Sequence, residues 1–136
     1  MDEIYTYCGK KANKYYVFTA IGITDLGFAQ VHAKVYRKVS EKNVSNFVKS
    51  IPSSELYFSD AAPSYGAALG SSVLSEKNAW TNLIESVNSQ FRQYVPALRR
   101  KTKSYAKSLK SLTQQIVNVL MTKFSKPFKV NFSVLN

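Results

Sequence analysis

The sequence contains few of the residues that form zinc sites or disulfides. It has one cysteine, Cys8, and one histidine, His32, among 136 residues. A structural zinc site needs about four such ligands, so none can form within this chain, and neither can an internal disulfide. The longest apolar run, Tyr15 to Ile23, is shorter than the roughly 20 residues that cross a bilayer. The sequence therefore predicts one globular domain in a reducing compartment, with no membrane partner.

Acidic residues are also scarce, and none occurs in the last part of the chain. All eight Asp and Glu fall within residues 1–85, where nine Lys and Arg leave a net charge of +1. Residues 86–136 contain ten Lys and Arg and no acid. A soluble surface usually mixes both signs, so this basic half is typical of a protein that binds a polyanion. We favour nucleic acid as that polyanion over a role in solubility alone.

Three strands are expected in the first 36 residues. Residues 3–9 alternate in polarity, and residues 15–23 form a continuous β-branched and aromatic run typical of a buried strand. Residues 28–36 alternate again and leave one wet face, which carries His32. The segments 9–14 and 24–27 have the composition of turns. Short turns between strands predict an antiparallel meander, with the third strand at a sheet edge.

From Ser40 onward the apolar period becomes helical. Ser40 is a plausible N-cap for a helix that Pro52 ends, and residues 55–59 make a short strand. A helix between the meander and this strand predicts a crossover to a parallel position in the sheet. Further helices are expected at 63–69, from residue 78 or 81 to 95, and at 105–124, with a last strand at 128–134. The predicted fold class is α/β, a mixed sheet flanked by helices, and an RNase H-like fold begins in this order.

Three of the eight acids occupy positions where catalytic carboxylates are expected. Asp2 begins the first strand, and Asp60 follows the strand at 55–59, outside the carboxyl end where active crevices lie. Glu85 shares the polar face of its helix with Arg92, a natural phosphate contact. Three such carboxylates can hold two Mg²⁺ or Mn²⁺ ions for phosphodiester chemistry. Each also has a non-catalytic explanation. Asp2 could belong to a frayed terminus, Asp60 could cap a turn, and Glu85 could be an exposed helix residue paired with Arg92 or Lys77.

Three segments in order give a resemblance to a known family. They are DEIYTYCGKKANKYYVFTAI, LYFSDAAPSY and NLIESVNSQFRQYVPALRRKTKSYAKS. Together they resemble the transposase of insertion sequence one, which is of the DDE type, over roughly residues 2–125. The resemblance implies that Asp2, Asp60 and Glu85 are the catalytic, metal-binding triad. The matching positions continue along the same helix and the segment after it, through Asn88, Arg92, Gln93, Arg100, Lys101, Ser104, Lys107 and Ser108.

The resemblance also implies an activity, a location and partners. We expect residues 1–136 to be a single RNase H-like catalytic domain with a basic C-terminal helical part at 97–136. The family's N-terminal zinc finger and helix-turn-helix are absent from this sequence, as in the product of the downstream reading frame alone. The implied reaction is metal-dependent DNA cleavage and strand transfer, in a prokaryotic cytoplasm at the nucleoid. The implied partners are transposon ends, target DNA, an upstream-frame DNA-binding protein and further copies of the chain on DNA.

Two other functions remain open on the sequence. One is a catalytically inactive or domesticated remnant that binds DNA without sequence preference, and the other is a cellular nuclease such as a junction resolvase. All three share a predicted DNA surface, in which basic residues contact phosphates and residues of the long helix position the scissile strand. The predicted DNA contacts lie on that helix and on the connector after it: Asn88, Arg92, Arg99, Arg100, Lys101, Lys103 and Lys107.

Overall fold

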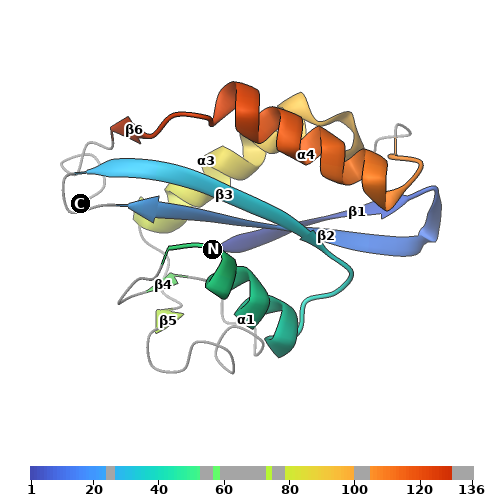
Figure 1. Cartoon of the computed structure of the whole chain (residues 1–136), viewed down its shortest axis with the longest axis horizontal. Coiled ribbons are helices and arrows are strands. Elements are labelled where there is room, and N and C mark those ends of the chain that lie inside the picture. The colour runs from blue at the N-terminus through green and yellow to red at the C-terminus, as the bar shows by residue number, and fades with distance from the viewer. Residues whose placement is uncertain (24–26, 53–56, 59–72, 75–78, 100–104, 130–136) are drawn as a thin grey trace.

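An antiparallel sheet with helices on both faces organises the chain (Figure 1). The computed structural model describes residues 1–23, 27–52, 57–58, 73–74, 79–99 and 105–129. The meander consists of β1 (Asp2–Cys8), β2 (Lys10–Ile23) and β3 (Phe28–Tyr36), and β6 (Phe128–Lys129) pairs with the start of β3. The sheet order is β1-β2-β3-β6, and each pair is antiparallel. The predicted meander is therefore confirmed.

β3 lies at the sheet edge for most of its length, as expected. Its pairing with β6 involves only Phe28 and Ala29, so residues 30–36 have a strand neighbour on one side alone within the described chain. The last strand was expected over 128–134. Its first two residues form β6, and the others lie outside the described residues.

The turn expected at residues 9–14 is wrong. The chain reverses at Gly9, which has a φ of 71°, and β2 already begins at Lys10. Because glycine lacks a Cβ, it enters the left-handed region without the steric penalty that other residues meet. A reversal at this single residue leaves the Lys-Lys-Ala-Asn run free to extend β2, with a shift of register between Tyr7 and Cys8.

The prediction of a parallel strand in the main sheet is also wrong. β4 (Tyr57–Phe58) pairs in parallel with β5 (Val73–Leu74) in a separate two-stranded sheet. Among the described residues, the four-stranded sheet contains only antiparallel pairs. The residue types around position 57 favour a strand, but the choice of partner depends on tertiary contacts that strand propensity does not encode. The short helix expected at 63–69 lies outside the described residues.

Three α-helices in the described part of the chain confirm the helical periodicity. They are α1 (Glu41–Ser50), α3 (Ala79–Tyr94) and α4 (Leu109–Lys123), with a 3₁₀ turn, η2 (Pro96–Leu98), after α3. The Ser40 hydroxyl accepts a hydrogen bond from the Asn43 amide, so Ser40 caps α1 as expected. α4 begins four residues later than expected. Ser108 caps it in the same way, while Ala106 forms a β-bridge with Cys8.

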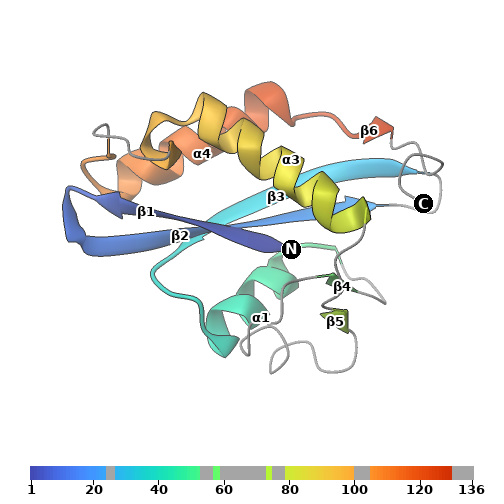
Figure 2. The ribbon, with the colours of Figure 1, turned by 180° about the vertical axis from the view of Figure 1, so that it is seen from behind.

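Helices cover both faces of the sheet, and this explains the continuous apolar run of β2. α3 and α4 lie on one face and α1 on the other (Figures 1 and 2). Neighbouring strand residues point to opposite faces, so Val17 packs against the α3–α4 layer and Phe18 against α1. Both are 0% exposed. None of the helices in the described part of the chain is long and apolar enough to cross a membrane.

Candidate functional site

Asp2 is held by hydrogen bonds at the start of β1. Its Oδ1 atom accepts from the backbone amide of Glu3 at 2.8 Å, and its Oδ2 atom accepts from the Asn88 side-chain amide at 2.8 Å. These two bonds fix the direction of the carboxylate. Asp2 as a whole is half-buried.

A buried hydrogen-bond chain supports this carboxylate from the sheet. The Thr19 hydroxyl lies 2.7 Å from Oδ1 of Asn88 and 3.3 Å from the Asp2 carbonyl oxygen. Thr19 is 0% exposed and Asn88 is 2% exposed, so their polar groups satisfy each other away from solvent. Oδ1 of Asn88 accepts from Thr19, and the amide nitrogen therefore faces Asp2 as the donor. We refer to these three residues as the Thr19–Asn88–Asp2 chain.

Sequence reasoning missed Thr19 and gave Asn88 a different role. Thr19 is the one hydroxyl in the apolar run 15–23 apart from those of its tyrosines, and it lies directly opposite Asp2 in the strand pairing. A lone threonine in a buried strand was the available signal. Asn88 was expected to contact DNA, but in the structure its side chain is buried and faces Thr19 and Asp2.

Glu85 and Arg92 flank Asn88 on α3. Glu85 lies three residues before Asn88, which corresponds to about 4.5 Å along the helix axis. Glu85 and Arg92 are seven residues apart and so project within about 20° of each other. Glu85 is exposed and Arg92 is half-buried, while Ile84, Val87 and Phe91 form the buried stripe. The helix that contacts Asp2 through Asn88 thus presents a carboxylate one turn away and a guanidinium on the same side.

The remaining predicted site residues have varied positions. Asp60, Arg100, Lys101 and Lys103 lie outside the described residues. Arg99 is exposed, but its guanidinium donates to the Gln93 carbonyl oxygen at 3.1 Å and so ties η2 to the end of α3. Lys107 is exposed just before α4. The structure therefore describes two of the three predicted catalytic carboxylates. Glu85 lies on α3, and Asp2 is hydrogen-bonded to α3 through Asn88.

The carboxylates of Asp2 and Glu85 suit a hard divalent cation better than a soft one. Within the described part of the chain, no three His, Cys, Asp or Glu side chains gather, so a complete ligand set is not described there. Cys8 lies at the far end of β1 from Asp2, about 20 Å along the strand, and burial raises the pKa of its thiol. Carboxylate oxygens such as those of Asp2 and Glu85 are the ligands that Mg²⁺ and Mn²⁺ prefer.

A shallow groove of about 400 Å³ lies elsewhere, along the free edge of β3 between α1 and α4. His32, Lys34, Phe47 and Met121 are among its lining residues, and none of its lining residues is acidic. His32 is half-buried instead of fully solvated, and burial lowers the pKa of its imidazole. The groove therefore has no carboxylate ligands and is separate from Asp2.

Comparison with known proteins gives one match. The sequence profile of a family described as IS1 transposase matches residues 1–126. No curated protein and no solved structure matches the chain significantly. The matched region includes the whole meander, α3 and α4. It therefore contains every candidate site residue.

Proposed function

Because the chain belongs to the IS1 transposase family, we propose that it carries the catalytic centre that cleaves DNA and joins the cut strand to a target. Asp2, Asp60 and Glu85 hold two Mg²⁺ or Mn²⁺ ions in this proposal. The observation that carries it is the Asn88–Asp2 hydrogen bond of 2.8 Å. This bond connects the first carboxylate of the triad to the helix that bears the third, and metal-ligating carboxylates are typically oriented by such partners.

The described residues have distinct roles in the proposed reaction. Bound divalent ions supply the activation of water and the stabilisation of charge on the phosphodiester. Asp2 is oriented for such ions by the Glu3 amide and by Asn88, and Thr19 fixes the orientation of Asn88. Glu85 provides an exposed carboxylate from α3, the helix that carries Asn88. Arg92 binds a phosphate oxygen of the scissile strand, for which its guanidinium geometry is suited.

The finer fold assignment also belongs to this proposal. We infer an RNase H-like domain in which Asp60 acts together with Asp2 and Glu85. The order of a three-stranded meander, a helix, a short strand and a carboxylate-bearing helix supports it. DNA is the partner, both as transposon end and as target. Further copies of the chain and an upstream-frame DNA-binding protein act with it on DNA.

The experiment that tests the function compares Asp60→Asn with wild type in a Mn²⁺-dependent nicking and joining assay on DNA. We expect the variant to lose nicking and joining while it keeps its DNA affinity, because the change removes one charge from the metal site and leaves the basic half intact. Glu41→Gln is the matched control, since Glu41 is an exposed acid in the first turn of α1. This control variant should cut and join like wild type.

Two outcomes would favour other functions. A wild type that binds DNA but never nicks or joins any DNA under Mn²⁺ would support the binding-only remnant, for which the basic half is sufficient. Cleavage of branched DNA without any joining would instead indicate a resolvase-like nuclease. Equal activity of Asp60→Asn and wild type would refute the site assignment.

A further inference from the structure

Four tyrosines and a lysine gather at the hairpin end of β1 and β2. Tyr5 lies opposite Tyr16 in the strand pairing and Tyr7 lies opposite Lys14, so all four side chains leave the same face of the sheet. Tyr105, in the segment before α4, joins them through an edge-to-face contact with Tyr7 at 5.4 Å between ring centroids. We call these five residues the tyrosine patch.

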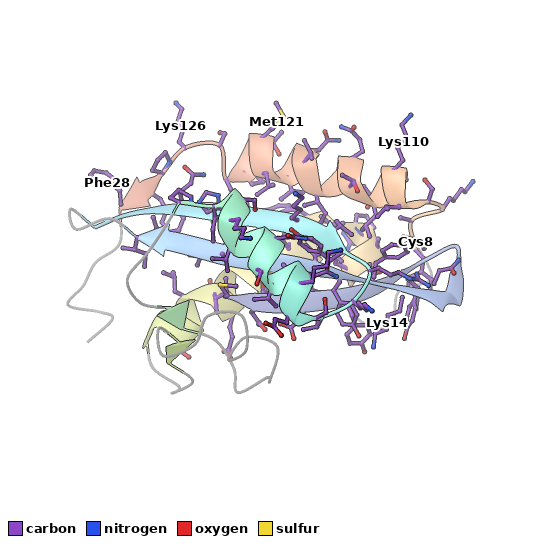
Figure 3. The ribbon with its side chains drawn as sticks, turned by 60° about the horizontal axis from the view of Figure 1, so that its bottom comes forward. Cys8, Lys14, Phe28, Lys110, Met121 and Lys126 are labelled. Atoms are coloured by element: carbon purple, nitrogen blue, oxygen red, sulfur yellow. The ribbon has the colours of Figure 1, made fainter. Side chains whose placement is uncertain are left out.

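Most of the patch lies beyond the helix that covers this face, and Tyr16 packs against the cluster under that helix. α1 packs on the same face through Phe47, which contacts Phe18 and Tyr36. The hairpin projects past α1 in both ribbon views (Figures 1 and 2), and Lys14 is labelled near its tip in Figure 3. Tyr5 is 57% exposed, which is high for a large aromatic side chain. Tyr7, Tyr16 and Tyr105 are half-buried, and Tyr16 packs against the core cluster under α1, so Tyr5 is the ring that the patch exposes most.

The rings are arranged with cations among them. The Lys14 ammonium lies 4.3 Å from the centroid of the Tyr5 ring and 5.3 Å from that of Tyr16. Tyr5 and Tyr7 are edge to face at 6.1 Å. Arg37, which follows β3, donates to the Lys14 carbonyl oxygen, but its guanidinium lies 4.7 Å from the ring of Tyr15, which leaves the opposite face of the sheet. The acid of β1 on this face is Glu3, at the end away from the hairpin tip.

The patch is also joined to the end of the basic connector, the segment 99–107 between α3 and α4. The Gly9 amide donates to the Ala106 carbonyl oxygen at 2.8 Å, and Cys8 and Ala106 form a β-bridge. These contacts hold Tyr105 and the exposed Lys107 beside the hairpin. Aromatic rings are thus continuous with a segment whose sequence is strongly basic, and the combination favours a ligand that carries both flat rings and negative charge.

We propose that the tyrosine patch binds unpaired nucleotides of a DNA strand, with a base stacked on Tyr5 and the backbone near Lys14. Stacking on aromatic side chains with adjacent cations is how proteins bind single-stranded nucleic acid without sequence preference. A base within a duplex has both faces covered by its neighbours, so this patch selects single-stranded over duplex DNA. The proposal rests on the proposed function for its ligand and adds to it a site for an unpaired strand. Tyr5 lies three residues along β1 from Asp2, about 10 Å, and its side chain leaves the opposite face of the sheet from that of Asp2.

The test measures affinity for a short oligothymidylate and for a duplex of the same length, without divalent metal so that cleavage does not intervene. Tyr5→Ala should weaken binding to the single strand on the order of 10- to 100-fold and leave duplex binding nearly unchanged. Tyr5→Phe, which keeps the ring, should bind like wild type. Tyr94→Ala is the matched control, because Tyr94 is 41% exposed and has the Lys123 ammonium 4.7 Å from its ring centroid, but lies at the end of α3.

A second measurement, of fluorescence, does not require the Tyr5→Ala variant to fold. Tyr5→Trp places an indole on the patch, and oligothymidylate should quench its fluorescence, whereas Tyr94→Trp should show no added quenching over wild type. Unchanged single-strand affinity in Tyr5→Ala, equal losses in Tyr5→Ala and Tyr94→Ala, or loss of self-association in place of DNA binding would each overturn the proposal. If the Tyr5 variants behave as expected and wild type never cuts DNA, the patch stands and the proposed catalytic function fails.

Discussion

Replacing Asn88 by Asp tests whether Asn88 orients Asp2. The change is nearly isosteric and keeps an oxygen that can accept from Thr19, but it turns the donor facing Asp2 into a second carboxylate. Two carboxylates at hydrogen-bond distance cannot both be ionised without strong repulsion, so one of them takes up a proton. The pKa of that carboxyl is raised in the folded state relative to the unfolded state.

The size of the effect follows from the cost of that proton. Protonating an ordinary Asp at pH 7 costs about 4 kcal/mol, since about three pH units separate pH 7 from its usual pKa and each unit corresponds to about 1.36 kcal/mol. This cost limits the loss of folding stability in Asn88→Asp at pH 7 to about 4 kcal/mol. A raised pKa gives stability that is present below the unfolded value and lost as pH rises, so the penalty should shrink to about 1.5 kcal/mol at pH 5.

The assay is urea denaturation of wild type and variant in the same buffers at both pH values. Thr19→Val is the matched control: it removes the donor to Oδ1 of Asn88, keeps the Asn88–Asp2 bond, and should cost about 1–3 kcal/mol without this pH dependence. Mn²⁺ should stabilise Asn88→Asp more than it stabilises wild type, because a cation relieves the repulsion between the carboxylates. A loss in Asn88→Asp that is the same at pH 7 and pH 5 would refute the placement of Asn88 against Asp2.

Three further predictions concern other parts of the molecule. Gly9→Ala should cost about 1–2 kcal/mol in denaturation, because Gly9 has a φ of 71°, whereas Gly22→Ala in β2 should be neutral or stabilising; equal effects would argue against the reversal at Gly9. The lowered pKa of His32 means that the folded state prefers the neutral ring, so stability is lost as pH falls below about 6.5, and His32→Gln should flatten that part of the stability profile relative to wild type. Substituting the four basic residues at 99, 100, 101 and 103 by Ala should reduce the log–log salt slope of duplex binding by about 2–4, and an unchanged slope would mean that this connector does not contact DNA.

Local patterns predicted most of the secondary structure. Alternation and apolar runs indicated the three meander strands, and helical spacing indicated α1, α3 and α4. Serine at a helix start marked α1 through Ser40, and Ser108 has the same role at α4. These features are readable because each depends on residues within a few positions of one another.

The features that sequence reasoning missed depend on residues far apart in the chain. The Asn88–Asp2 bond joins residues 86 positions apart, and the Thr19–Asn88 bond joins residues 69 positions apart. The sequence predicted Asn88 as a DNA contact on the long helix, but the packing of α3 on β1 and β2 turns its side chain inward. The partner of β4 was missed for the same reason, since Tyr57 pairs with Val73 and not with the main sheet.

The central claim is that Asp2, Asp60 and Glu85 form one metal site. The direct measurement is the crystal structure of the protein with Mn²⁺, with the ions located by their anomalous scattering. We predict two peaks about 3.5–4 Å apart, within coordination distance of the three carboxylates, with Asn88 still hydrogen-bonded to Asp2. Carboxylates of Asp60 and Glu85 more than about 10 Å apart, well beyond what such a metal pair spans, or Mn²⁺ bound only elsewhere, would contradict the account.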